Sequence, residues 1–239
     1  MPKVTLISYT PNAENILIFT KSTRLNMDTA LLETIAAMPM EDKLKELEYM
    51  SNTIPSSWEF VDFVFSVERV SRAYTHQQVR TRSGSYAQQT MRILNMDEFK
   101  YIYSDKMGEH PTCLIVDEAI DKIKSCYRSL IRIGVPPEDA RGILPTNIST
   151  NIVCKFNLRT FAELAKSRTG GRTQSEYQEI INIMIDKVLD VYPWVEMFLF
   201  NKGRNVFDDI ESFAVAKFPD LKERGELLKL VDKLRKELG

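Results

Sequence analysis

Apolar side chains recur along this chain with two different periods. Between residues 59 and 68 they stand at every second position, which is the period of a β-strand with one buried face. Short buried strands are also predicted over residues 4–9 and 149–156. The strand pattern therefore occurs in three separate stretches of the chain.

Most other apolar positions follow the helical period of three to four residues, with charged side chains between them. Pro136 to Asp139 mark the start of a short helix, because proline and acidic residues favour a helix N-terminus. Asn157 is expected to cap the helix that follows it, and Gly170 and Gly171 to end that helix. Helices are predicted over residues 13–23, 40–51, 70–80, 112–133, 158–167 and 173–191, and two amphipathic helices finish the chain, the last over 221–238.

The order of these elements predicts the fold class and the domain organisation. No internal repeat, low-complexity tract or linker interrupts the pattern, so residues 1–239 are expected to form a single α+β domain. Its central sheet, mostly antiparallel or mixed, is flanked by helices. Residues 82–86 are expected to form a Gly/Ser loop suited to close contact with a ligand. Residues 201–239 are expected to be a helical C-terminal elaboration, whose simplest role is subunit packing.

The charge of the whole chain excludes some classes of partner. Its 32 lysines and arginines balance 33 acidic residues, and the formal net charge is −1, so nothing global attracts nucleic acid or an anionic membrane. No apolar run reaches the roughly 20 residues that span a bilayer, and no signal-peptide pattern is found. Three cysteines without CxxC spacing and two histidines predict no metal site. We expect a cytoplasmic protein that binds neither nucleic acid nor membrane.

Arginine is nevertheless distributed unevenly. Residues 69–96 contain five arginines and no aspartate, glutamate or lysine. Residues 141–172 contain four arginines and two lysines, and Glu163 is their one acid. Each guanidinium offers a planar fork of donors that suits phosphate or carboxylate. Local clusters of this kind in a neutral chain indicate a discrete anionic ligand.

Neutral hydrogen-bonding side chains accompany the first cluster, among them Ser83, Ser85 and Gln89. Such a mixture fits a nucleotide, with arginines for phosphate and amides for the base. The simpler alternatives are scattered surface charge and, for Lys166 and Arg168, attraction to the C-terminal dipole of their helix. The pattern by itself names no reaction, because the chain has no hydrolytic triad, Walker loop or dinucleotide motif.

Several spaced motifs resemble one known family. The stretch RTRSGSYAQQTMR at residues 80–92 resembles the signature R-H-R-x(7)-S-x-R of flavin-dependent thymidylate synthases. Further blocks similar to that family are SWE at 57–59, RGILP at 141–145, and NLR at 157–159 with Arg168. The likeness runs from about residue 3 to residue 190.

The resemblance implies a thymidylate synthase-complementing-like fold and a methyltransferase-type enzyme that converts dUMP to dTMP. It further implies methylenetetrahydrofolate as methylene donor, reduced FAD as hydride source, NADPH as reductant of the flavin, and a homotetramer with sites where subunits meet. The dUMP-binding residues that it implies are Gln77, Arg80, Gln88, Thr90, Arg92, Arg141 and Arg168, and Arg168 is expected to be catalytic by polarising the pyrimidine. The FAD-binding residues that it implies are Ser57, Glu59, Arg80, Thr81, Arg82, Asn157, Arg159 and Glu163.

Some positions depart from the family pattern. Thr81 stands in place of the histidine of the R-H-R motif, and Thr90 in place of its serine. Phe60 and Arg172 stand where histidine is common, and Glu163 brings a negative charge towards the expected flavin. These departures keep two alternatives open. One is another flavin- and folate-dependent C5 modification, such as hydroxymethylation of a pyrimidine nucleotide, and the other is a non-catalytic nucleotide- or flavin-binding protein.

Overall fold

The computed structural model describes residues 2–92, 96, 99–169, 173–200, 210, 214 and 221–238. Met1–Phe200 forms one compact unit and Asn201–Gly239 a second. In the second unit α11 spans Leu221–Leu238, as predicted, and most of the remaining C-terminal elaboration lies outside the described residues. That both units belong to a single domain stays a prediction. Among the described residues, no helix is long and apolar enough to cross a membrane.

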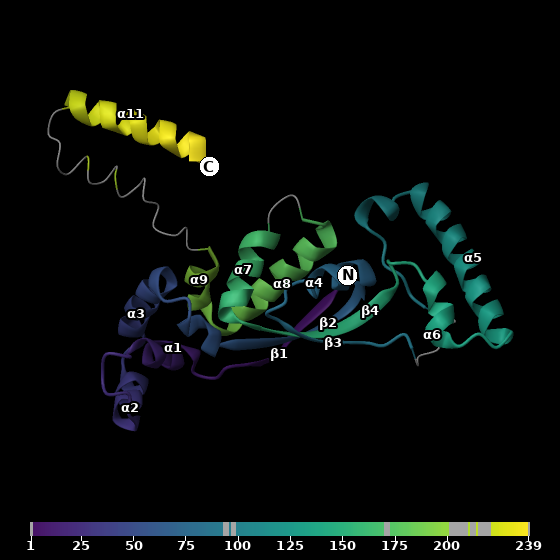
Figure 1. Cartoon of the computed structure of the whole chain (residues 1–239), viewed down its shortest axis with the longest axis horizontal. Coiled ribbons are helices and arrows are strands. Elements are labelled where there is room, and N and C mark those ends of the chain that lie inside the picture. The colour runs from purple at the N-terminus through teal and green to yellow at the C-terminus, as the bar shows by residue number, and fades with distance from the viewer. Residues whose placement is uncertain are drawn as a thin grey trace. The chain divides into compact units, whose positions relative to one another are not determined.

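A four-stranded sheet forms the centre of the first unit (Figure 1). Its strand order is β1-β2-β4-β3, and each pair of neighbours is antiparallel. The strands are β1 (Lys3–Tyr9), β2 (Asp62–Ser71), β3 (Ser85–Gln88) and β4 (Ser149–Asn157). The predicted α+β class is therefore confirmed, and of the two sheet types expected the antiparallel one is observed.

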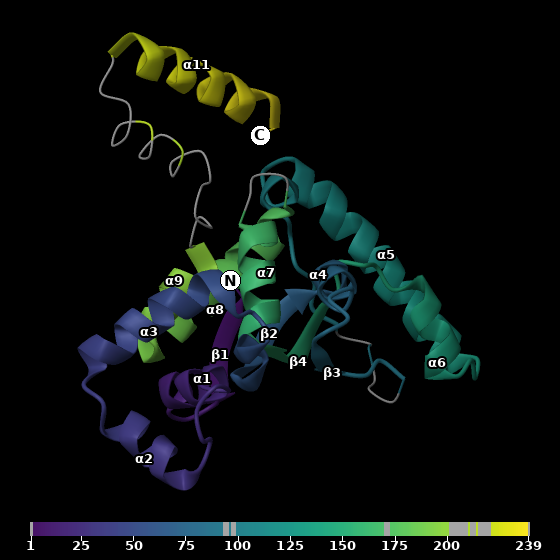
Figure 2. The ribbon, with the colours of Figure 1, turned by 60° about the vertical axis from the view of Figure 1, so that its left-hand side comes forward.

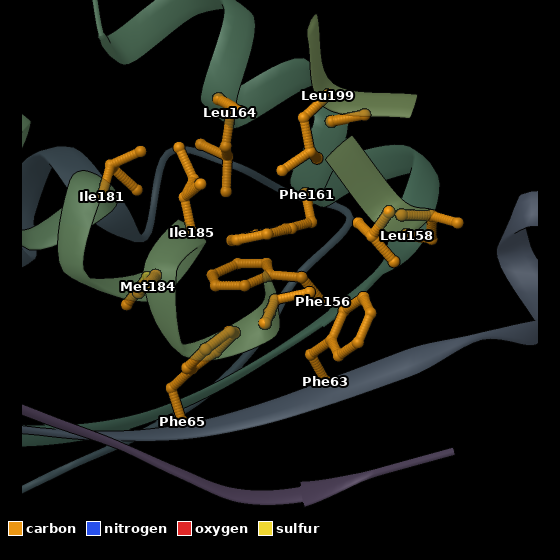
Figure 3. Packing of buried hydrophobic residues seen from close by; sticks show 14 of the residues in the cluster. Phe63, Phe65, Phe156, Leu158, Phe161, Leu164, Ile181, Met184, Ile185 and Leu199 are labelled. Atoms are coloured by element: carbon orange, nitrogen blue, oxygen red, sulfur yellow. The ribbon is translucent and has the colours of Figure 1, made fainter. Parts of the chain in front are cut away.

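One face of this sheet carries the hydrophobic core. Side chains at alternate positions of β2 and β4 are buried, because α7 (Leu158–Arg168) and α8 (Ser175–Val191) cover that face. Phe63 and Phe65 of β2 pack against Phe161 of α7, with ring centroids 5.7 and 5.6 Å apart (Figure 3). Aromatic packing of this kind fixes α7 on the sheet.

The segment before β2 forms a turn instead of the predicted strand start. The strand expected over 59–68 begins only at Asp62, because Ser57–Phe60 form a 3₁₀ turn (η1). The helix expected over 70–80 is shorter for a related reason, since β2 continues to Ser71. The Ser71 hydroxyl then accepts a hydrogen bond from the amide of Tyr74 and caps α4 (Arg72–Gln78).

Two elements have weak sequence signals. The expected loop over 82–86 ends in β3, an edge strand that forms because its backbone pairs with β4. The sequence pattern missed α2 (Thr29–Ala37) altogether, since Ile35 is its one buried residue. The side chain of Asp28 caps α2 by accepting a hydrogen bond from the amide of Leu31.

The remaining helices lie at the two ends of the sheet (Figures 1 and 2). At one end are α1 (Ala13–Lys21), α2 and α3 (Met40–Thr53), and at the other are α5 (Thr112–Arg132) and α6 (Pro137–Ala140). A short helix, α9 (Glu196–Phe200), completes the first unit. A small second core of Phe99, Ile120 and Ile148 packs α5 against the sheet end, and α6 continues directly into a 3₁₀ turn, η3 (Arg141–Ile143).

Candidate active site

The turn that carries Arg80, Thr81 and Arg82 directly follows α4, and hydrogen bonds to residues on either side fix its backbone. The amide of Thr81 donates to the carbonyl of Gln78, and the hydroxyl of Tyr86 lies 2.7 Å from the Thr81 carbonyl oxygen. Gly84 is required in this turn, because an added Cβ would lie 2.5 Å from the Tyr86 hydroxyl oxygen. The fold thus fixes the backbone of the turn and leaves Arg80 and Arg82 exposed.

Arg168, the last residue of α7, lies beside this turn. Its guanidinium carbon is 5.1 Å from the ring centroid of Tyr177, an arrangement that allows a cation–π interaction. Its Nε atom is buried and has no hydrogen-bond partner among the described residues. Burial raises the pKa of Tyr177, while the charge of Arg168 and the hydroxyl of Thr81 act in the opposite direction. Thr81 and Arg168, which are 87 positions apart in the sequence, therefore both act on one tyrosine.

The N-terminal end of α7 gathers several residues that the resemblance assigns to FAD. The side-chain oxygen of Asn157 accepts a hydrogen bond of 2.9 Å from the amide of Thr160, which confirms the predicted cap. The hydroxyl of Thr160 in turn contacts that of Ser83 at 3.0 Å. This contact joins the 80–84 turn to the start of α7.

Arg159 on this helix is surrounded by acids. Its Nη1 lies 2.7 Å from a carboxylate oxygen of Glu59, and its Nε lies 3.7 Å from one of Glu163. All three side chains are well exposed, so each ion pair is weak. Ser57, by contrast, is buried, and its amide donates to the carbonyl of Ile54, so it is less accessible than Glu59.

A second group of expected ligands, for the nucleotide, lies around α6 and the end of β3. Arg92 forms an ion pair with Glu138, with Nη2 and Oε2 3.1 Å apart. Arg141 donates from Nε to the backbone carbonyl of Glu138 at 3.0 Å. The hydroxyl of Thr90 accepts a hydrogen bond from the amide of Arg92. These contacts place Thr90, Arg92 and Arg141 near one another.

The two glutamines of this set face neighbouring side chains. The side-chain amide of Gln88 donates to the hydroxyl of Thr75 at 2.9 Å, and that of Gln77 donates to Gln174. Both donors lie on or beside α4 and are half-buried. α4 thus contacts β3 through Thr75 and the N-cap residue of α8 through Gln77.

Arg72 was not assigned a role from the sequence, although the structure places it with Arg141. Burial, and secondly the nearby charge of Arg141, lower the pKa of Arg72. Its Nη2 donates to the carbonyl of Gln89 at 2.9 Å, and its Nε is buried without a partner among the described residues. The signal that could have found it is its position in the acid-free window 69–96.

The described cavities do not coincide with either group. A cavity of about 520 Å³ lies between α5 and the start of α4, lined mainly by apolar residues and by none of the predicted site residues. Most of the predicted residues instead lie in two exposed or half-buried groups, one at α7 and one at α6, and Arg72 joins the second. We refer to these as the α7 group (Arg80, Thr81, Arg82, Asn157, Arg159, Arg168) and the α6 group (Arg72, Gln88, Thr90, Arg92, Arg141).

This fold and these groups define an α+β protein whose surface guanidinium groups suit small anionic ligands. Residues 5–194 match the sequence model of a family described as thymidylate synthase complementing protein. The chain belongs to this family, that of the flavin-dependent thymidylate synthases, and the resemblance seen in its motifs is confirmed.

Three relatives named flavin-dependent thymidylate synthase show how far the similarity extends. The protein from Clostridium tetani is 31% identical, and the match covers 80% of this chain and 84% of that relative. The protein from Sulfurisphaera tokodaii is 30% identical over 80% of this chain and 74% of the relative. The protein from Geobacter sulfurreducens is 29% identical over 81% and 84%.

Proposed function

We propose that this chain is a flavin-dependent thymidylate synthase that converts dUMP to dTMP. Methylenetetrahydrofolate supplies the carbon, and NADPH reduces the flavin. The observation that carries the proposal is that Arg168 lies over the ring of Tyr177, whose pKa is also affected by Thr81 at the centre of the arginine turn. Family membership and the names of the relatives support the same reaction.

The side chains of the α7 group suit FAD. Arg80 and Arg82 are exposed, and neither makes an ion pair with another described residue, so both remain available for a pyrophosphate. When bound, FAD supplies the hydride chemistry that no amino-acid side chain offers. Ser57 fits less well, because it is buried at the start of η1.

The chain's own residues provide charge and orientation. We assign the phosphate of dUMP to Arg92 and Arg141, and the pyrimidine to Arg168, whose positive charge stabilises negative charge that develops on the ring. Packing of the Arg168 guanidinium on Tyr177 keeps it oriented. No cysteine is needed as a nucleophile, and burial raises the pKa of Cys154 to about 12, which keeps that thiol protonated.

We further propose that the active enzyme is a homotetramer in the cytoplasm, with each site completed between subunits. The side chains of the α7 and α6 groups are exposed or half-buried on one chain, and the cavity described above contains neither group. A neighbouring subunit that covers them would exclude water and strengthen every charge interaction within the site.

The test is a product analysis with the purified protein. Incubation with FAD, NADPH, methylenetetrahydrofolate and isotopically labelled dUMP should give labelled dTMP by mass spectrometry. A labelled hydroxymethyl product would show the alternative C5 modification instead. Flavin binding without any modified nucleotide would indicate the non-catalytic alternative.

A further inference from the structure

Glu138 contacts two of the arginines that we assign to the nucleotide phosphate. Its carboxylate oxygen Oε2 lies 3.1 Å from Nη2 of Arg92. Its backbone carbonyl accepts a hydrogen bond of 3.0 Å from Nε of Arg141. A single acidic residue therefore contacts two guanidinium groups, one through its side chain and one through its backbone.

Arg72 supplies a third guanidinium to the same region. The amide of Arg72 donates to the carbonyl of Ile148, and that of Ala73 to the carbonyl of Thr146. These bonds fix the start of α4 against the segment that follows Arg141. The Arg72 side chain is held by its bond to the carbonyl of Gln89, and its buried Nε has no partner among the described residues. Of the guanidinium groups in this region, that of Arg92 contacts the Glu138 carboxylate, that of Arg141 contacts the Glu138 backbone, and that of Arg72 contacts the Gln89 backbone.

We propose that Glu138 sets the affinity of this site for phosphate esters, because its carboxylate takes the place at Arg92 that a nucleotide phosphate needs. Binding then exchanges one anion for the other. The inference rests on the proposed function, since it takes Arg92 and Arg141 as phosphate ligands. A carboxylate and a phosphate present similar oxygen acceptors to a guanidinium, so they compete for the same donors. Their like charges repel when both are close.

The Arg92–Glu138 ion pair is exposed, so exchanging the carboxylate for a phosphate costs little free energy. The side chains of Arg92 and Glu138 are 64% and 51% exposed, and an ion pair as accessible as this is weak. A phosphate carries more charge than a carboxylate and more acceptor oxygens, so it wins the competition. The bond from Arg141 uses the backbone of Glu138, and it therefore survives when the carboxylate is neutralised.

The variant Glu138→Gln removes the competing charge and keeps both the side-chain shape and the backbone acceptor. Asp139→Asn is the matched control, because Asp139 is the next residue of α6 and its side chain makes no hydrogen bond or ion pair with another described residue. Titration calorimetry with dUMP and with deoxyuridine, which lacks the phosphate, measures the Kd of each protein.

We expect Glu138→Gln to lower the Kd for dUMP by roughly two- to fivefold relative to the wild type. The Kd for deoxyuridine should stay unchanged, and Asp139→Asn should match the wild type with both ligands. The gain should shrink as salt is raised, because an exposed charge is screened. In the double variant Glu138→Gln/Arg92→Gln, this gain in affinity for dUMP should be lost.

An unchanged or higher Kd for dUMP in Glu138→Gln would overturn the inference, since it would mean that Glu138 is neutral or that it orients Arg92 for the phosphate. Failure of the proposed function would give a different result. If dUMP binds neither the wild type nor any variant, the proposed function is wrong. Inorganic phosphate is then the probe, and tighter phosphate binding by Glu138→Gln than by Asp139→Asn would support the exchange, whereas equal binding would refute it.

Discussion

At the scale of single residues, the partner of each arginine decides what that arginine can do. Arg159 lies between two carboxylates, so its charge is largely balanced within the chain. Arg82 has no ion pair with another described residue and offers its whole guanidinium to a ligand. Arg168 lies on an aromatic ring that restrains its orientation and leaves its charge uncompensated. This difference is why we assign the pyrimidine to Arg168.

Gly84 provides a test at the same scale, because its missing side chain lets the arginine turn approach the core. In Gly84→Ala the new Cβ would lie 2.5 Å from the Tyr86 hydroxyl oxygen and 2.7 Å from the Phe156 ring, so one of them must move. We expect a loss of roughly 1–3 kcal/mol in the free energy of unfolding. Thermal unfolding followed by circular dichroism measures the loss.

Gly142→Ala is the control for this substitution, since an added Cβ there meets nothing within 4 Å. Its melting temperature should stay close to that of the wild type. Equal melting temperatures for Gly84→Ala and Gly142→Ala would show that the turn is not packed as tightly as described.

At the scale of elements, α7 connects the site residues near its N-terminal end with Arg168 at its C-terminal end. Its first turn is capped by Asn157 and contacts Ser83 through Thr160, and its last residue is Arg168. The helix is fixed to the sheet by Phe161. A rigid helix that carries ligands at both ends keeps them at a constant separation, which is what a site for a large cofactor requires.

Cys154 of strand β4, which lies under α7, should make the free energy of unfolding fall at alkaline pH. Burial raises the pKa of Cys154 from 9.0 to about 12, so the folded state holds its proton more tightly than the unfolded chain does. Stability from this group is therefore complete below about pH 9 and is lost as the pH rises towards 12, by at most about 1.4 kcal/mol per pH unit. Tyr86, whose pKa is also raised to about 12, mainly by burial, contributes in the same direction from about pH 10.

Melting temperatures between pH 8 and pH 11 test this dependence. In Cys154→Ala the decline should be shallower than in the wild type. Cys126→Ala is the control, because Cys126 is exposed and its removal should leave the slope unchanged. Parallel slopes for all three proteins would contradict the assignment to Cys154.

At the scale of the whole molecule, the sequence predicts the core better than the edges. Strand β4 and helix α7 were found because their apolar side chains recur with a clear period and all face one core. Helix α2 was missed because it buries so little, and β3 was read as a loop because its pairing partner lies far away in the sequence. A local sequence pattern does not reveal that a strand will pair with another strand far away in the chain.

The same reasoning applies to the candidate site. The arginine clusters at 69–96 and 141–172, which together contain one acid, marked these arginines as unusual, and the family motifs implied roles for them. Neither signal could show that Glu59 and Glu163 share Arg159, or that Glu138 joins Arg92 and Arg141. Those contacts depend on how separate elements pack, which only the folded chain determines.

Assembly gives a prediction at this scale. If each site takes Arg168 from one subunit and Arg92 from another, two inactive variants can complement each other. Arg168→Ala and Arg92→Ala, unfolded together and refolded as a mixture, should regain up to roughly a quarter of wild-type activity, because some sites then combine two intact halves. The separately refolded variants should stay inactive. A mixture no more active than its components would mean that both arginines come from the same chain.

The most direct test of the central claim, that Arg168 acts on the pyrimidine, compares the turnover of Arg168→Ala with that of Lys166→Ala. Lys166 lies on the same helix, is exposed and has no ion pair with another described residue, so its removal leaves the proposed site untouched. We predict that Arg168→Ala keeps its fold and its flavin absorbance but forms dTMP at least roughly a hundredfold more slowly, while Lys166→Ala stays near the wild-type rate. Near-normal dTMP formation by Arg168→Ala would contradict the account.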